Sequence, residues 1–146
     1  MNYLFQFIFL YLGALISLTN PNPETYRLVW SDEFDQATAE LDSSKWFMET
    51  LRPNGGRWYN NEMQHYTNRL DNAYVSQGTL KIVAKKEAYT DSAIPLEYTS
   101  ARLNSKFHFT YGKVEVRAKL PKAQGTWPAI WTLGSNLETV GWPACG

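Results

Sequence analysis

The sequence has 146 residues, which is the length of one domain and too short for two ordinary ones. Its 14 basic and 14 acidic residues cancel, so they give no electrostatic case for binding to nucleic acid or to an anionic membrane surface. The single cysteine, Cys145, excludes a disulfide framework within these residues. Aromatic residues make up 15% of the chain, a surplus that favours stacking of rings against flat faces of an uncharged ligand.

The first 20 residues carry no charge, and their apolar run is long enough for a signal peptide but marginal for a membrane span. A polar, Pro-containing break follows, which favours a signal peptide over residues 1–20 and a linker over residues 21–27. A signal anchor is the alternative, because the segment lacks a basic start and a clean A-x-A site. Both readings place the rest of the chain outside the cytoplasm, secreted or periplasmic, with no membrane contact beyond this segment.

Beyond this segment the apolar residues recur with a period of two, which indicates strands rather than helices. In residues 112–120, Val114, Val116 and Leu120 share one face and charged residues take the other. Strands are also predicted at residues 26–30, 79–86, 102–109 and 127–133. Asp42 is predicted to cap a turn, and further turns are predicted at Gly78 and at residues 52–56, 110–112 and 121–125. Many short strands without a long helix indicate an all-β antiparallel sandwich or barrel.

Two tryptophans in the last predicted strand are candidate ligand contacts. As strand residues, Trp127 and Trp131 would share one face at a spacing of about 13 Å, which suits successive sugar rings along a groove. The alternative is that both rings belong to the core, as in most sandwiches. Pro128 favours the first reading, because it cannot donate to a strand ladder and therefore marks an irregular or edge position.

Amides and one arginine are further candidates. Asn61 lies in residues 58–67, where amides alternate with aromatic rings, and an amide offers both a donor and an acceptor to a hydroxyl. A turn in which Asn61 bonds its own backbone explains the pattern equally well. Arg102 could hold two hydroxyls with its forked guanidinium, or it could be a solvated charge. His65 and His108 lack metal-ligand spacing, and no catalytic constellation emerges from the spacing alone.

Six motifs, taken in order, closely resemble glycoside hydrolase family 16 and, within it, the laminarinase-like endo-β-1,3-glucanases. They are LVWSDEF (28–34), WYNNEMQHYT (58–67), SQGTLKIVAKKE (76–87), YTSARLNSK (98–106), YGKVEVRAKLP (111–121) and GTWPAIWTLG (125–134). The resemblance implies a concanavalin A-like jelly-roll β-sandwich of two antiparallel sheets, with a substrate cleft across its concave face. Residues 28–146 would then be the N-terminal portion of the catalytic domain, so the fold would be incomplete in this chain.

The resemblance also implies an activity, which is hydrolysis of β-1,3- or mixed β-1,3/1,4-glucan with retention. In the family the catalytic strand, E-x-D-x-E or E-x-D-x-x-E, follows a stretch like residues 141–146. The catalytic residues are therefore expected just after Gly146, where this sequence stops, and we predict no catalytic residue here and an inactive chain. The alternatives are a non-catalytic, lectin-like glucan-binding jelly roll and a family member acting on agar, carrageenan or xyloglucan.

Binding residues follow from the resemblance as well. Asn61, Arg102, Trp127 and Trp131 match positions that line the non-reducing-end part of the family's cleft, so a β-glucan polysaccharide is the expected partner. Glu33 and Gly78 match positions that bind a structural calcium through backbone oxygens. Calcium is thus a possible structural ion, no cofactor is required for the expected chemistry, and we expect a monomer.

Overall fold

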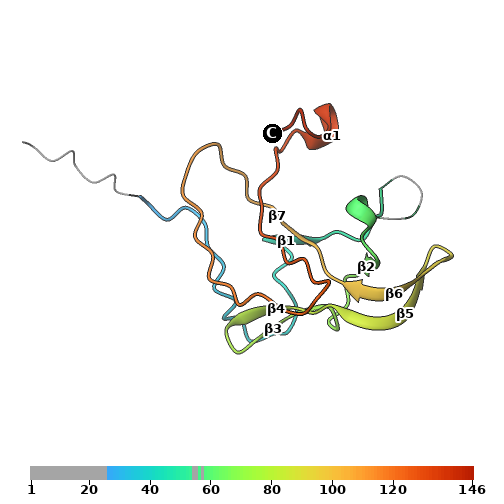
Figure 1. Cartoon of the computed structure of the whole chain (residues 1–146). Helices are drawn as coiled ribbons and strands as arrows, with labels where there is room; N and C mark the ends of the chain where they lie inside the picture. The colour runs from blue at the N-terminus through green and yellow to red at the C-terminus, as the bar shows by residue number, and fades with distance from the viewer. Residues whose placement is uncertain (1–25, 54–55, 57) are drawn as a thin grey trace, which may run out of the picture.

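The computed structural model describes residues 26–53, 56 and 58–146. The predicted signal peptide at residues 1–20, and most of the predicted linker, lie outside the described residues. The elements are β1 (Trp46–Met48), the 3-10 turn η1 (Tyr59–Asn61), β2 (Gln64–Tyr66), β3 (Ala73–Ser76), β4 (Thr79–Ile82), β5 (Lys85–Asp91), β6 (Ile94–Ser100), β7 (Leu103–Ser105) and α1 (Leu137–Val140) (Figure 1). None of the helices in these ranges is long and apolar enough to cross a membrane.

The strands pair into three small sheets. β1 pairs antiparallel with β7, and β3 pairs antiparallel with β4. In the third sheet the central strand β6 pairs antiparallel with β5 and parallel with β2. Helix is confined to single short turns, so the predicted all-β class is confirmed. The parallel β2–β6 pair was not expected from the sequence.

Two hairpins are closed by two-residue turns whose central residues have positive φ. Gln77 and Gly78, at φ 52° and 65°, join β3 to β4 with Ser76 opposite Thr79. This geometry is that of the tight hairpin turns in which glycine is favoured, and it confirms the turn predicted at Gly78. Ser92 and Ala93, at φ 49° and 63°, close β5–β6 in the same way without a glycine.

The turn predicted at Asp42 is also confirmed. The Asp42 carbonyl accepts from the amides of Lys45 and Trp46 at 3.0 Å, and Asp42 Oδ1 accepts from the Ser44 amide at 2.8 Å and the Ser44 hydroxyl at 2.6 Å. These bonds from Ser44 lower the pKa of Asp42 below its ordinary value. The turn leads directly into β1, which carries one edge of the site described below.

A row of aromatic rings holds the first described segment to β1 and to the residues after β7. Trp30 packs edge-on against Trp46 at 5.6 Å between ring centroids and stacks on Phe107 at 5.8 Å, and Phe34 stacks on Trp46 at 6.0 Å. Trp46 Nε1 donates to Asp32 Oδ2 at 2.6 Å. Within residues 26–30 only Trp30 packs in this way, and the other four residues are exposed. The strand predicted there is wrong, because the stretch has no paired neighbour in the described part of the chain.

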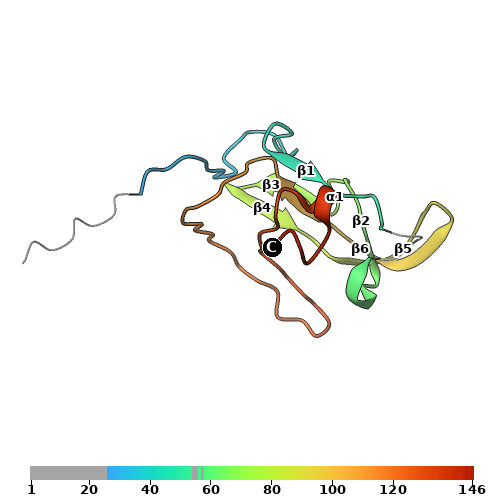
Figure 2. The same ribbon diagram turned by 90° about the horizontal axis from the view of Figure 1, so that it is seen from above.

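The strands predicted at residues 112–120 and 127–133 are also absent as paired strands in the described chain. The segment between β7 and α1 forms a long open loop in two perpendicular views (Figure 1, Figure 2), and the strand predicted at residues 102–109 is limited to β7. Val114, Val116 and Leu120 are more than half exposed. An alternating pattern specifies which face a strand would bury, but a strand also needs a hydrogen-bonding neighbour, and the described residues supply none here.

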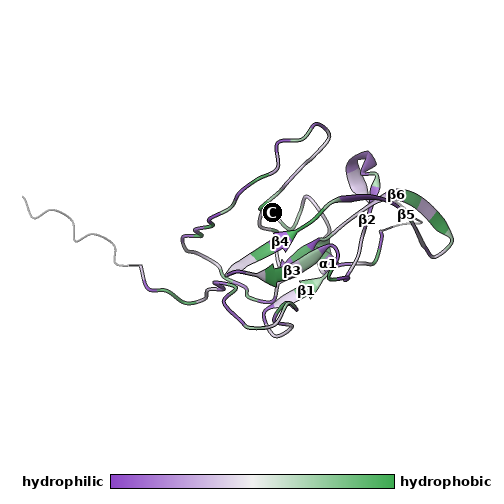
Figure 3. Ribbon diagram, turned by 90° about the horizontal axis from the view of Figure 1, so that it is seen from below, coloured by the Kyte–Doolittle hydropathy of each residue, from purple (hydrophilic) through white to green (hydrophobic). Residues whose placement is uncertain are grey.

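The buried interior is small and partly polar. Among the described residues, its hydrophobic members on strands are Ala73, Val75 and Leu96, and Trp58 and Ala101 lie outside the strands. Figure 3 shows hydrophobic residues on β3, β4 and the β5–β6 hairpin beside polar ones. Four polar residues are also buried, each at most 2% exposed: His65, Thr67, Asn72 and Thr99. His65 Nε2 lies 3.0 Å from the Ile94 carbonyl, so its buried ring has a polar partner.

Asn72 is the centre of this polar interior, and its side chain is fully buried. Its Oδ1 accepts from the Thr67 hydroxyl at 2.5 Å and from Arg69 Nη2 at 3.0 Å. Its Nδ2 donates to the Val83 carbonyl at 3.0 Å and to Thr99 Oγ1 at 2.9 Å. One amide thereby connects the chain after β2, the end of β4 and strand β6.

Glu87 completes this cluster and gives it a pH dependence. The hydroxyl of Thr99 and Nη2 of Arg69 both donate to Glu87 Oε1. The Thr99 bond, followed by the Arg69 bond, lowers the pKa of Glu87 below its ordinary value of 4.5. Because the ionised form is favoured in the folded state, its contribution to stability is present above the unfolded pKa and is lost as pH falls through the folded pKa.

We therefore expect Glu87→Gln to be less stable than the wild type at pH 7, and the difference to shrink as pH falls below the ordinary glutamate pKa of 4.5 and through the lowered folded-state pKa. Urea unfolding followed by tryptophan fluorescence across this pH range measures the difference. Glu97→Gln is the matched control, because Glu97 is an exposed strand residue without a side-chain hydrogen bond or ion pair in the described part of the chain. A Glu87→Gln deficit that stayed constant with pH would contradict the assignment.

Candidate functional site

Arg102 lies between β6 and β7, and the β1–β7 pair places Glu49 beside it. The Glu49 amide donates to the Arg102 carbonyl at 2.9 Å, which continues the strand pairing by one residue. Arg102 Nε lies 2.8 Å from Glu49 Oε2, although its N–H is not aligned for a hydrogen bond, so the contact is an ion pair. Asn104 Nδ2 donates to the same Glu49 oxygen at 3.0 Å. The carboxylate is therefore held from two sides.

The Arg102 guanidinium also lies over two indole rings. Its Cζ lies 5.6 Å from the ring centroid of Trp58 and 5.2 Å from that of Trp131. Such contacts attract a cation to the ring face. Trp58 is only 4% exposed, whereas Trp131 remains 57% exposed. Arg102 thus rests on a buried ring and holds an exposed ring at the surface.

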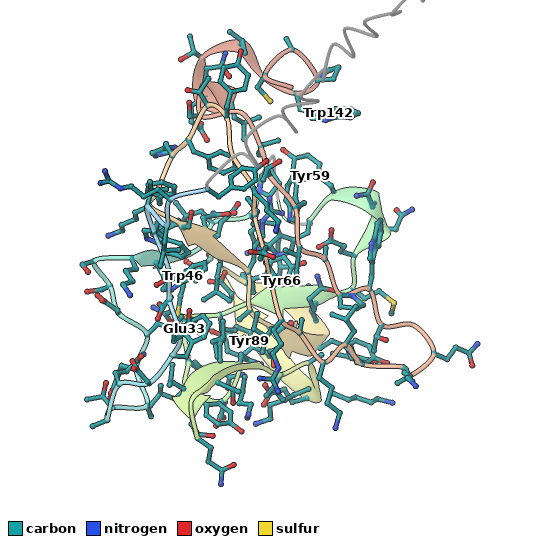
Figure 4. All side chains as sticks on the ribbon, turned by 90° about the vertical axis from the view of Figure 1, so that its left-hand side faces the viewer. Glu33, Trp46, Tyr59, Tyr66, Tyr89 and Trp142 are labelled. Carbon is teal, nitrogen blue, oxygen red and sulfur yellow. The ribbon has the colours of Figure 1, made fainter. Side chains whose placement is uncertain are left out.

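A second group of polar side chains continues from Trp58. Tyr66 packs edge-on against Trp58 with 4.6 Å between ring centroids, and its hydroxyl donates to Glu62 Oε2 at 2.7 Å. Gln64 Nε2 donates to the same oxygen at 2.8 Å. Burial, followed by the bond to Glu62, raises the pKa of Tyr66 above its ordinary value. Figure 4 places Tyr66 near the centre of the molecule, so this group joins the site to the interior.

Asn61 is exposed in η1, directly before Glu62. Asn60 and Asn61 have φ of 57° and 59°, a left-handed conformation that asparagine tolerates better than most residues. Neither side chain makes a hydrogen bond within the described ranges, so the alternative in which Asn61 bonds its own backbone is not formed there. The local backbone accounts for the residue type, and the Asn61 amide is free to meet a ligand.

The structure brings together two of the four predicted ligand contacts. Arg102 and Trp131 touch, whereas Trp127 is 72% exposed and has no ring or cation partner among the described side chains. The turn predicted at residues 121–125 precedes it, with the Thr126 amide donating to the Ala123 carbonyl at 3.2 Å. The open loop therefore presents Trp127 to solvent while Arg102 holds Trp131.

Sequence reasoning did not select Glu49 and Trp58, which hold Arg102. Glu49 had no local indication, because its partner lies 53 positions away and is reached only through strand pairing. Trp58 does have one, since it begins the aromatic and amide motif that contains Asn61. Both carboxylates of the site, Glu49 and Glu62, accept hydrogen bonds from protein donors.

The last residues of the sequence, after α1, form turns rather than a paired strand. The Cys145 amide donates to the Gly141 carbonyl at 3.0 Å, and the Gly146 amide donates to the Pro143 carbonyl at 3.1 Å. Gly146 itself is exposed and has no side chain to contribute, so it is no member of the site. The catalytic carboxylates expected just after Gly146 are not residues of this sequence, and their position stays a prediction.

Glu33 and Gly78, the positions matched to a structural calcium, both lie in exposed loops. No group of three or more His, Cys, Asp or Glu side chains that could hold a metal ion occurs in the part of the chain described. Calcium binding through backbone oxygens stays a prediction. A hollow beside residues 32–45 is lined mainly by acidic and polar side chains and contains none of the four predicted ligand contacts.

The chain is similar to proteins whose descriptions name β-glucan or a β-glucanase. A family model described as "Beta-glucan synthesis-associated protein SKN1/KRE6/Sbg1" matches residues 14–146. A beta-glucanase of Rhodothermus marinus is 45% identical over 127 residues, which cover 83% of this chain and 41% of the relative.

Two solved structures agree. The catalytic domain of an endo-1,3-beta-glucanase (laminarinase) of Thermotoga petrophila is 43% identical with a TM-score of 0.72, over 83% of this chain and 48% of that one. A variant of LamA from Zobellia galactanivorans, solved with laminaritriose and laminaritetraose, is 61% identical with a TM-score of 0.73, over 77% of this chain and 45% of that one.

The chain thus spans less than half the length of these relatives. The similarity nevertheless runs through every motif on which the resemblance was based, and the matched solved structures share the chain's strand-rich fold. The predicted resemblance and the jelly-roll fold that it implies are therefore confirmed. The chain belongs to the family of beta-glucan synthesis-associated proteins SKN1/KRE6/Sbg1, and it is a laminarinase-like member of glycoside hydrolase family 16.

Proposed function

We propose that the whole protein is an exported glycoside hydrolase that cleaves β-1,3- or mixed β-1,3/1,4-glucan with retention, and that the residues of this chain bind the polysaccharide. The observation that carries the proposal is the Arg102 guanidinium held beside the exposed Trp131 ring. An indole face suits the apolar face of a glucosyl ring, and a forked guanidinium suits two of its hydroxyls. The descriptions of the matched family, of the Rhodothermus marinus relative and of the Thermotoga petrophila laminarinase all name β-glucan or a β-glucanase.

Within this proposal Asn61 and Trp127 extend the same binding surface. Asn61 offers a free amide next to the Glu62 group, and Trp127 offers a second exposed ring four residues before Trp131. None of the described residues is assigned as nucleophile or acid. We therefore expect the 146-residue chain to bind laminaritetraose without releasing reducing sugar from laminarin, and the whole protein to do both.

Calorimetric titration with laminaritetraose and a reducing-sugar assay on laminarin test the two parts separately. Binding by the chain together with hydrolysis by the whole protein supports the proposal. Binding without hydrolysis by the whole protein overturns the enzymatic part and leaves a lectin-like glucan-binding protein. Absence of binding in both overturns the proposal.

Trp131→Ala is expected to weaken laminaritetraose binding about tenfold, because it removes both the stacking face and the ring that Arg102 contacts. Titration calorimetry measures the change. Trp142→Ala is the matched control, since Trp142 is 76% exposed but has no ring or cation contact with the site residues in the described structure. Figure 4 shows Trp142 at the end of the molecule that carries α1. Equal losses in the two variants would contradict the placement of the site at Trp131.

A further inference from the structure

Two arginines of this chain lie over aromatic rings beside a carboxylate, yet they use their nitrogen atoms differently. Arg69 lies 4.9 Å from the Tyr89 ring centroid, and its Nη2 donates to three protein acceptors, on Asn72, Glu87 and Thr99. Arg102 lies over two rings, but neither Nη1 nor Nη2 donates to a protein acceptor in the described ranges. Nη2 of Arg69 is therefore used for hydrogen bonds within the protein. Nη1 and Nη2 of Arg102 remain available to donate to a ligand.

The position of Arg102 is fixed without those donors. Its Cζ lies 5.6 Å from the Trp58 ring centroid and 5.2 Å from that of Trp131, and Glu49 Oε2 lies 2.8 Å from its Nε. Only about 20% of the Arg102 side chain and 26% of the Glu49 side chain are exposed, so water screens this ion pair only partly. Glu49 thus cancels much of the arginine's charge and still leaves its two outer nitrogens available.

This arrangement has a consequence for ligand choice. An unpaired arginine would attract a sulfate or a carboxylate on a saccharide through its charge. Here an anionic group placed at the outer nitrogens would also approach the Glu49 carboxylate, and like charges brought together at a binding site oppose association. A neutral hydroxyl pair accepts the same N–H groups without that repulsion. Discrimination of this kind rests on a repulsive group as much as on an attractive one.

Resting on the proposed function, we infer that Glu49 is a specificity-determining residue, which pairs with Arg102 so that the site takes neutral glucan and rejects sulfated or carboxylated saccharides. Trp58 is the positioning residue, a buried ring against which the Arg102 guanidinium lies. The other carboxylate of the site, Glu62, is bound by Tyr66 and Gln64 and adds to the negative charge that an anionic ligand would meet.

The test compares wild type and Glu49→Gln for binding to laminaritetraose and to chemically sulfated laminaritetraose by titration calorimetry. Glutamine keeps an oxygen that accepts the Asn104 bond but lacks the charge, and thermal unfolding checks that the variant is folded. We expect Glu49→Gln to bind the sulfated ligand about tenfold more tightly than the wild type does, while its affinity for the neutral ligand changes much less. The gain for the sulfated ligand should shrink with added salt.

Glu87→Gln is the matched control, because it removes a carboxylate from the other arginine cluster and should leave the ratio of the two affinities unchanged. For each protein the affinity for laminaritetraose is divided by the affinity for sulfated laminaritetraose. If wild type and Glu49→Gln give the same ratio, and the wild type binds laminaritetraose, the inference is overturned and the proposed function stands. If the wild type prefers the sulfated ligand, the inference is overturned as well. If the wild type binds neither ligand, the proposed function fails and the inference fails with it.

Discussion

Replacing Arg102 with methionine is expected to weaken laminaritetraose binding about a hundredfold. This is the effect expected when two hydrogen bonds from a charged group to the ligand are lost. Methionine keeps a long, flexible apolar side chain at this position but supplies no hydrogen-bond donor. It also leaves the Glu49 carboxylate without its cation and removes the group that holds Trp131. Arg102→Lys keeps the charge but not the fork, so its loss should lie between those of wild type and Arg102→Met.

Titration calorimetry measures these affinities, with circular dichroism to confirm folding. Arg117→Met is the matched control, because Arg117 is an exposed arginine of the open loop without an ion pair in the described part of the protein. Its binding should equal that of the wild type. An Arg102→Met protein that bound laminaritetraose as tightly as the Arg117→Met protein would remove Arg102 from the site.

Replacing Asn72 with alanine is expected to lower the free energy of unfolding by about 3 kcal/mol, because buried partners would lose their hydrogen bonds. The amide binds Thr67, Arg69, Thr99 and the Val83 carbonyl, and alanine can replace none of these bonds. With several groups left unpaired at once, the loss should exceed that of an ordinary surface substitution.

Urea unfolding at pH 7 measures the loss. Asn68→Ala is the control, because Asn68 is exposed, lies four residues before Asn72 and has no side-chain hydrogen bond among the described residues. It should change the free energy of unfolding by less than about 0.5 kcal/mol. Similar losses for the two variants would show that the buried network does not hold these strands together.

The sequence predicted well those elements that are decided by a few neighbouring residues. It predicted poorly those that depend on pairing with a distant strand. The turns at Asp42 and Gly78 were predictable because each is decided within a few residues, by a side-chain cap in one case and a positive φ in the other. The β5–β6 hairpin was missed because Ser92 and Ala93 occupy positive φ without the usual glycine. The parallel β2–β6 pair joins segments more than thirty residues apart and has no local signature.

The same division applies to the site. Arg102 and Trp131 could be selected from the sequence because their types and motif positions indicated sugar contacts, although which residues fix them could not. Glu49 reaches Arg102 only through the β1–β7 register, and Trp58 only through the tertiary packing of η1 and β2. The period-two pattern at residues 112–120 failed for a related reason: an alternating face does not name the neighbour with which a strand pairs.

Strand β6 lies between β2 and β5 in its sheet, and this position determines the order in which the two strand pairs form during folding. Its pairing with β5 crosses a turn of two residues, so this hairpin can form on the microsecond scale typical of such contacts. Its pairing with β2 must close a much longer stretch of chain, and it needs β6 to be present as a template. We expect the hairpin to assemble first and β2 to join later, at the step that also brings Trp58 against Arg102. The ligand surface would then be among the last features to form and, on unfolding, among the first to be lost.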